Sequence, residues 1–209
     1  AAVLKKTGEP AVAPLIALFQ DDRKDARLGA ALALQAIGEP AVDSLVAALV
    51  DDVRLTRICA AYTLGLVASA RAVQPLLAAL GDEAASVRRN AIGALAEIRD
   101  PVSVRPIIAA LRDEYSIVRQ AAAEALATLG DARAVAPLVA ALRDEDVDVR
   151  HAVAAALVRL GDADALADPG VGVEEPPSQE DSAPEWARTP YDRALTRIES
   201  TPELSSFVD

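Results

Sequence analysis

The sequence predicts an all-α protein, a right-handed superhelix of stacked helix pairs. The first observation behind this is composition. Alanine, leucine and valine make up most of an apolar content of 52%, whereas aromatic residues contribute only 3%. Alanine and leucine are strong helix formers, so helices are the expected secondary structure. The second observation is a motif that recurs about every 31 residues, a length that holds two short helices and is typical of repeat proteins.

The repeat is clearest where "VRQAAAEALATLGDA" returns thirty-one residues later as "VRHAVAAALVRLGDA". Each cycle carries an arginine, here named a turn arginine, at spacings of 30, 31, 31 and 31 residues. An acid before it, a leucine seven residues after it and a proline stay in phase, and such phasing indicates one repeated structural unit. The turn arginines are Arg27, Arg57, Arg88, Arg119 and Arg150; the acids are Asp22, Asp52, Asp82, Asp113 and Asp144; the leucines are Leu34, Leu64, Leu95, Leu126 and Leu157; the prolines are Pro14, Pro75, Pro106 and Pro137, with Ser44 in the remaining place.

Each repeat divides into a first helix, helix A, and a second helix, helix B. "RAVAPLVAAL" is one helix A, and "VDVRHAVAAALVRLG" is one helix B whose apolar residues follow a 3.6-residue period. Gly130 suits the left-handed position after a helix, and Asp131 suits the N-cap of the next one. The inner proline lies more than a turn into helix A, so we expect it to bend that helix.

The repeats set the expected domain boundaries. A lone pair cannot bury its apolar stripe, so the pairs should stack into a solenoid over residues 1–166. The opening "AAVLKKTG", residues 1–8, matches the end of a helix B, so the chain begins inside a sixth pair: either the native N-terminus is missing or the first repeat is reduced to half. The five complete pairs are 9–38, 39–68, 69–99, 100–130 and 131–161.

The last part of the chain has a different composition. Residues 167–188 are rich in Pro, Gly, Ser and acids without a period, which predicts a flexible acidic linker. Residues 189–209 predict an amphipathic helix or docking segment, which either caps or docks on the solenoid or binds a partner. The side chains expected to dock are Trp186, Tyr191, Leu195, Ile198, Leu204 and Phe207.

Several functional classes are disfavoured. The net charge of −11 argues against binding to nucleic acid, which needs basic residues. No apolar run is long enough for a membrane span. A single cysteine, Cys59, fits a reducing compartment, so we expect a cytoplasmic protein. No catalytic, cofactor-binding or metal-binding constellation occurs in the sequence, and the lone His151 is expected to lie on the surface.

A helix pair with proline in helix A, aspartate at the turn and arginine early in helix B resembles the HEAT repeat. The 31-residue form "DEDVDVRHAVAAALVRLGDADAL" is similar to the short subtype named after phycobilisome lyases, over roughly residues 1–166. The departures are Ser44 for proline, Ala26 and Thr56 for valine, and a final helix A, "DADALADP", that fades at Pro169. The resemblance implies that Asp113 and Asp144 meet Arg119 and Arg150 in the turns, within and between repeats, where they stabilise the stack.

The resemblance also implies which face of the solenoid binds partners. In similar proteins the positions one, two, five and nine residues after the turn arginine line the concave surface. These positions are apolar in the first two repeats and polar in the last three, and an exposed apolar patch is typical of a partner site. The alternative is that preceding sequence or a neighbouring helix covers the patch. The candidate partner-binding residues are Leu28, Leu32, Ile58, Tyr62, Leu66, Arg89, Glu97, Gln120, Glu124, His151 and Arg159.

These features favour a non-enzymatic scaffold or adaptor that binds a partner protein or peptide on the helix-B face. The alternative, implied by the name of the subtype, is a phycobilisome-lyase-like or chaperone-type subunit that acts on a chromophore-bearing protein. HEAT-like DNA glycosylases need a basic concave face. Here only Arg89 and Arg159 supply positive charge on that face, and Glu97 and Glu124 offset it.

Overall fold

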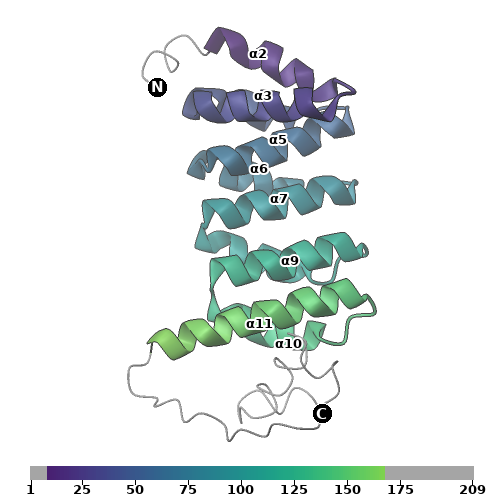
Figure 1. Ribbon diagram of the computed structural model, residues 1–209, viewed down its shortest axis with the longest axis vertical. Coiled ribbons are helices and arrows are strands. Elements are labelled where there is room, and N and C mark those ends of the chain that lie inside the picture. Colours follow the sequence, from purple (N-terminus) through teal and green to yellow (C-terminus); the bar gives the residue numbers. More distant parts are fainter. Residues whose placement is uncertain (1–8, 168–209) are drawn as a thin grey trace, which may run out of the picture. The chain divides into compact units, whose positions relative to one another are not determined.

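A computed structural model describes the backbone of residues 9–167 and the side chains of residues 10–161 (Figure 1). Every regular element within residues 9–167 is a helix, and this stretch contains no strand. Short and long helices alternate along the chain, as the 31-residue period predicts. The prediction of an all-α repeat fold is therefore confirmed. The chain divides into two compact units, residues 1–110 and residues 111–209.

Helix A is not one continuous α-helix. In the later repeats it begins as a single 3-10 turn and continues as a seven-residue α-helix. The first repeat reverses this order, with α2 (Glu9–Ala17) followed by η1 (Leu18–Gln20). The other first helices are η2 (Glu39–Ala41) with α4 (Val42–Ala48), η3 (Ala70–Ala72) with α6 (Val73–Ala79), η4 (Pro101–Ser103) with α8 (Val104–Ala110), and η5 (Ala132–Ala134) with α10 (Val135–Ala141).

This division sets the place of the inner proline. Pro75, Pro106 and Pro137 each occupy the third position of the α-helical part and the sixth position of the whole helix A, counted from the start of its 3-10 turn. Pro14 is likewise the sixth residue of α2. The inner proline therefore lies more than a turn into helix A, as predicted, and the bend that we expect there stays a prediction.

The start of helix A is capped by the side chain predicted to do so. Asp131 accepts a hydrogen bond from the backbone N–H of Arg133 at 2.9 Å. The Arg133 side chain also donates to the same carboxylate, and these bonds lower the pKa of Asp131 to about 2. Asp100 and Ser69 make the equivalent backbone contact in two other repeats, to Val102 and Arg71. The turn between repeats is thus set by a short polar side chain.

Helix B is longer and regular. Four of these helices have fourteen residues each: α3 (Lys24–Ile37), α5 (Arg54–Val67), α7 (Ala85–Ile98) and α9 (Ser116–Leu129). Gly130 follows α9 with φ 69° and ψ 22°, the left-handed conformation that the sequence predicts. Ala68 and Arg99 take a left-handed conformation at the same point, with φ of 53° and 59°, although neither is glycine. Packing of the repeat therefore overrides the local preference at those two positions.

The last helix differs from the prediction. The repeat period places a helix end at Gly161 and a fading helix A beyond it. Instead α11 (Val147–Ala167), a helix of 21 residues, continues through Gly161. Glycine tolerates helical geometry as well as the left-handed turn, and no proline follows within the next turn to stop the helix.

The first unit is a stack of successive helix pairs. Within it α3 packs against α5 and α5 packs against α7, so these second helices lie side by side (Figure 1). The first helices α2, α4 and α6 pack against the second helix of their own pair. The core between the two layers is almost entirely aliphatic. Its fully buried residues include Phe19, Leu34, Leu45, Leu64, Leu76, Ile92, Leu95 and Ile107.

The second unit follows the same plan in its described part. Helix α9 packs against α11, and α10 packs against α11. Val118, Leu126, Leu138, Val149 and Val153 are all buried in this unit. Leu126 and Leu157 occupy the phased leucine position, and Leu157 is 7% exposed while Leu126 is fully buried. The phased leucines are therefore core residues in this unit.

Candidate functional site

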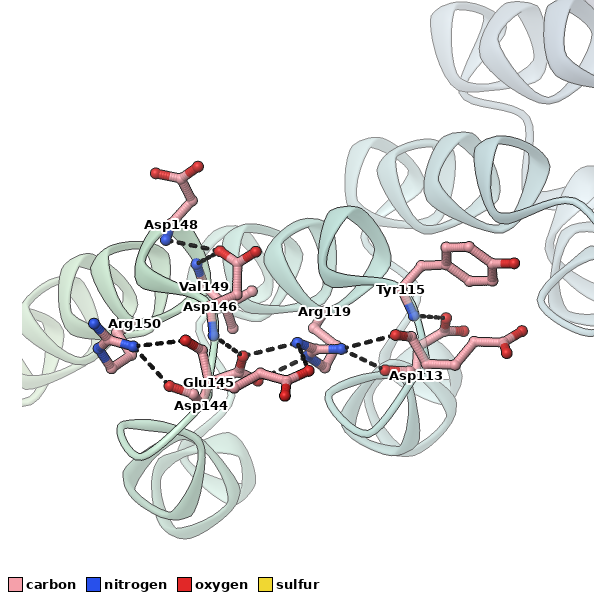
Figure 2. A network of polar contacts seen from close by, with 10 residues as sticks. Asp113, Tyr115, Arg119, Asp144, Glu145, Asp146, Asp148, Val149 and Arg150 are labelled. Carbon is pink, nitrogen blue, oxygen red and sulfur yellow. Dashed lines mark hydrogen bonds and ion pairs between the residues drawn. The ribbon is translucent and has the colours of Figure 1, made fainter.

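The turn arginines hold the turn that connects helix A to helix B. Arg119 Nη1 donates hydrogen bonds to the carbonyl oxygens of Asp113 and Glu114, at 2.9 and 3.1 Å (Figure 2). Arg150 repeats the pattern with Asp144 and Glu145, at 2.8 and 3.1 Å. A guanidinium has several donors in a fixed plane, which suits two adjacent carbonyls that the helices leave unpaired.

The same guanidinium also joins one repeat to the next. Arg119 Nε and Nη2 donate to the two carboxylate oxygens of Asp144 at 2.7 and 2.8 Å, a two-point contact seen in Figure 2. Arg57 makes the equivalent contact with Asp82 in the first unit. Arg119 and Asp144 have side chains only 8% and 9% exposed. The expectation that these residues meet within and between repeats is confirmed, and their burial indicates a structural role.

The turn carboxylate also has a second contact. Asp144 accepts a hydrogen bond from the backbone N–H of Asp146 at 2.9 Å, and Asp113 does so from Tyr115 at 3.0 Å. Partial burial raises the pKa of Asp144, but the hydrogen bonds from Arg119 and Asp146 outweigh it and lower the pKa below its usual value.

In the first two repeats, the phased acid is one residue earlier than the sequence alignment placed it. Asp21 and Asp51, not Asp22 and Asp52, accept the backbone hydrogen bonds of the turn, at 2.8 Å in both cases. The turn arginine of the first repeat, Arg27, contacts the carbonyl oxygens of Asp21 and Asp22, but within residues 10–161 it forms no ion pair. Asp21 and Asp51 lie six residues before Arg27 and Arg57, the same offset that Asp82, Asp113 and Asp144 have from their own turn arginines.

The helix-B positions in the first two repeats are open to solvent. Leu28 and Leu32 on α3 are 42% and 49% exposed, and Tyr62 on α5 is 41% exposed. Ile58 and Leu66 on α5 are partly exposed. Because α3 packs directly against α5, these five side chains form one surface within the first unit, named here the apolar strip. No helix in the described part of the first unit covers it.

Two basic residues that the sequence reasoning missed border the apolar strip. Lys24 precedes Leu28 by four residues on α3, and Arg54 precedes Ile58 by four on α5. Residues four apart lie on one helix face, so each helix presents a cation followed by apolar side chains. Both cations are exposed, and neither forms an ion pair within residues 10–161. The i, i+4 spacing would have been enough to find them.

The next helix continues the surface with polar groups. Arg89 and Glu97 on α7 are exposed, and Gly93 lies between them along the same face. Since α7 packs against α5, the apolar strip ends at this helix. The structure thus places the predicted change from apolar to polar positions inside the first unit.

The remaining predicted residues lie in the second unit. Glu124 on α9 is exposed and accepts a hydrogen bond from Gln120 at 2.9 Å. His151 and Arg159 on α11 are exposed. This pair of helices therefore presents a polar surface, and no large apolar side chain occupies the corresponding positions.

Cys59 lies beside the apolar strip and is half-buried. Burial raises the pKa of its thiol, and the nearby Arg27 only partly opposes this. A thiol with a raised pKa is a poor nucleophile at neutral pH. Among the described side chains, no group of three or more His, Cys, Asp and Glu lies close enough together to hold a metal ion.

Two further predictions concern other parts of the chain. The docking residues of the tail, from Trp186 to Phe207, lie outside the described residues. Between residues 9 and 167 no single helix is long and apolar enough to cross a membrane; one pair, Lys24–Ile37 with Glu39–Ala48, reaches that length and composition only together and is bent by 117°.

The turn contacts and the alternation of short and long helices occur in a chain whose sequence matches a known family. The HEAT repeats family matches residues 42–127 and 104–168, which together make up more than half of the sequence. The chain belongs to the HEAT repeats family. The resemblance to the HEAT repeat is therefore confirmed, and a chain of a phycocyanin lyase is consistent with the short subtype.

Solved structures of HEAT-like proteins are similar to this HEAT-repeat chain. The complex of CpcE and CpcF of phycocyanin lyase from Nostoc sp. PCC7120 contains a chain with 26% identity and a TM-score of 0.66, and the match covers 70% of this chain and 98% of that chain. The Escherichia coli protein YibA has 21% identity and a TM-score of 0.62, over 91% of this chain and 64% of that one. An engineered protein has 20% identity and a TM-score of 0.53, over 94% and 92%. Among curated proteins, none matches the sequence.

Proposed function

We propose that this HEAT-repeat protein is a non-enzymatic scaffold that binds a partner protein or peptide on the helix-B face of its first unit. HEAT-repeat solenoids are typical of protein-interaction scaffolds. The observation that carries the proposal is the apolar strip, in which Leu28, Leu32 and Tyr62 are each more than 40% exposed.

The apolar strip has the properties of a surface that binds a partner, because its side chains do not contribute to the core of the fold. Its side chains project from helices whose opposite faces already form the core, with Leu34 and Leu64 fully buried. The stack is held by other residues, such as Arg57, which contacts Asp82. Covering the exposed half of a leucine or tyrosine side chain contributes roughly 1 kcal/mol, so three such residues account for about 3 kcal/mol of binding energy. A partner of modest affinity can obtain a large part of its binding energy there.

The test is capture of a partner by the full chain. The protein is immobilised, exposed to the lysate of its source cells, and the bound proteins are identified by mass spectrometry. The double variant Leu32→Asp with Tyr62→Asp should lose its specific partner by at least about tenfold, because two charges enter the apolar strip. Helix content by circular dichroism should stay unchanged, since both side chains point to solvent.

Val50→Asp is the matched control. Val50 is apolar and 83% exposed, but it lies between helix A and helix B of its pair and outside the strip. This variant should retain the partner that the unmodified chain captures. Equal capture by the double variant and the Val50 variant would refute the proposal.

A second function is favoured by one comparison. The chain from the phycocyanin lyase complex is 26% identical and is matched over 98% of its length. A lyase-like or chaperone-type subunit that handles a chromophore-bearing protein would share that architecture. Mixing the full chain with a free bilin tests this reading, because binding to the protein would shift the bilin absorbance band. An unchanged spectrum would leave the scaffold as the proposed function.

A further inference from the structure

The apolar strip has a charged border with a fixed order along each helix. On α3 the order is Lys24, Leu28 and Leu32; on α5 it is Arg54, Ile58 and Tyr62. Each step is four residues, so the side chains follow one another along one face. The two helices pack side by side, and Gln35 near the end of α3 donates a hydrogen bond to the Leu66 carbonyl oxygen near the end of α5. The helices therefore run in the same direction, and the two cations lie at the same end of the strip.

Some charged residues near these cations already have partners, whereas the acids Asp22, Asp25 and Asp52 near the same end are exposed. Arg57 is buried and paired with Asp82, and Arg23 is paired with Asp21. The carboxylate of Asp51 accepts a backbone hydrogen bond within its own turn. The side chains of Lys24 and Arg54 form neither ion pairs nor hydrogen bonds with any residue between 10 and 161. An acidic ligand could therefore form ion pairs with both cations without displacing an existing partner.

The sequence contains a segment with the complementary order. Residues 174–185 hold five acidic residues and no basic one. After them come Trp186 and an amphipathic stretch in which Tyr191, Leu195 and Ile198 recur at the spacing of one helix face. An acidic arm followed by an apolar helix face matches a cationic border followed by an apolar strip. Three of the six Phe, Trp and Tyr residues of the chain lie in its last 24 positions.

We infer that the strip binds a segment in which an acidic arm precedes an amphipathic helix, and that residues 174–209 of this chain are such a segment. The inference rests on the proposed function, because it names the class of ligand for the same face. Apolar contacts to Leu32 and Tyr62 hold the helix, and Lys24 and Arg54 hold the arm. A ligand of this kind lays the apolar face of its helix on an apolar surface of the receptor.

The experiment measures binding of a fluorescent peptide of residues 174–209 to the full chain by fluorescence anisotropy. The receptor carries Leu195→Asp and Ile198→Asp, so that its own segment cannot compete with the peptide. We expect saturable binding with a dissociation constant on the order of 10 µM. Affinity should fall several-fold between about 0.1 and about 0.5 M salt, because exposed charges contribute to it.

Variants of the receptor separate the two parts of the ligand. Lys24→Glu with Arg54→Glu should weaken binding about tenfold and remove most of its salt dependence. Leu32→Asp with Tyr62→Asp should abolish binding. Arg105→Glu is the matched control, since Arg105 on α8 is exposed and lies outside the strip; it should bind as the unmodified receptor does.

Two results would overturn the inference. One is the absence of saturable binding up to about 1 mM peptide. The other is equal binding of a peptide in which the five acids of residues 174–185 are replaced by lysine. If either occurs while the strip still captures a partner, the proposed function stands and only the class of ligand is wrong. If the peptide binds but no partner is captured, the inference stands and the proposed scaffold function is rejected.

Discussion

Gly65→Ala should destabilise the protein although alanine is the better helix former. Gly65 lies inside α5, where it packs against α7. A Cβ atom added there would come within 2.9 Å of the Ala94 Cα atom and 3.1 Å of its Cβ atom. Carbon atoms in contact normally stay about 3.5–4.0 Å apart, so the two helices would have to separate by roughly 0.5–1 Å.

The magnitude follows from two opposing terms. Overpacking a well-filled core costs about 1–3 kcal/mol. Replacing glycine by alanine in a helix interior gains about 1 kcal/mol. Gly65→Ala should therefore lose roughly 0–2 kcal/mol of unfolding free energy. In Gly29→Ala on α3 the new Cβ atom has nothing within 4 Å, so this variant should gain the unfolding free energy that comes from the higher helix propensity of alanine, with no cost of overpacking.

The comparison of the two variants is the sharper measurement. Urea unfolding followed by circular dichroism should place Gly65→Ala about 1–3 kcal/mol below Gly29→Ala. Thermal unfolding should show a gap of several degrees in the same direction, at about 2–4 °C for each kcal/mol. If the Gly65 variant were at least as stable as the Gly29 variant, the close approach of α5 and α7 would be refuted.

Four further predictions use the same unfolding measurement. Ser103→Ala should raise the unfolding free energy by about 1 kcal/mol, because the buried hydroxyl finds no hydrogen-bond partner among the described residues; lower stability would contradict this. Ala68→Gly should gain about 1 kcal/mol by relieving a left-handed alanine, and an unchanged midpoint would argue against strain there. Arg119→Met should cost about 3 kcal/mol, since it leaves the Asp144 carboxylate and two turn carbonyls without their donor; a loss below about 1 kcal/mol would deny the contact its structural role. Asp144→Asn should be less stable than the unmodified chain at neutral pH, and the difference in unfolding free energy should shrink as the pH falls below about 4. The reason is that a carboxylate whose pKa is lowered in the folded state stabilises the fold above its unfolded pKa and loses that contribution when it is protonated. A difference that does not depend on pH would show that the charge of Asp144 does not stabilise the fold.

Much of the fold could be predicted from the sequence, because residues that recur in phase in every repeat occupy the same place in the packing of each helix pair. The phased leucines had to be buried in every cycle, and Leu34, Leu64, Leu95 and Leu126 are. The Gly130–Asp131 turn was predictable from local chemistry alone, since it needs only a left-handed glycine and a capping carboxylate.

The sequence reasoning failed where two solutions have the same local pattern. Gly65, Gly29 and Gly93 are all interior helix glycines, and only packing distinguishes the first from the others. Asp21 and Asp22 are adjacent acids, and the turn geometry selects Asp21, which lies six residues before Arg27, as the hydrogen-bond acceptor. For the glycines the deciding contact joins two neighbouring helices, whereas counting six residues back from each turn arginine would have found Asp21.

For the candidate surface, the spacing of helix B predicted which residues share a face, because helical geometry is local. It could not show that Leu28, Leu32 and Tyr62 stay uncovered, since exposure depends on what neighbouring helices reach. The sequence by itself therefore determined the repeated unit, its capping chemistry and its helix faces, all of which depend on residues within a few turns of one another. Only the tertiary structure decided which carboxylate each arginine meets and how closely α5 approaches α7, because these depend on contacts between helices that lie far apart in the chain.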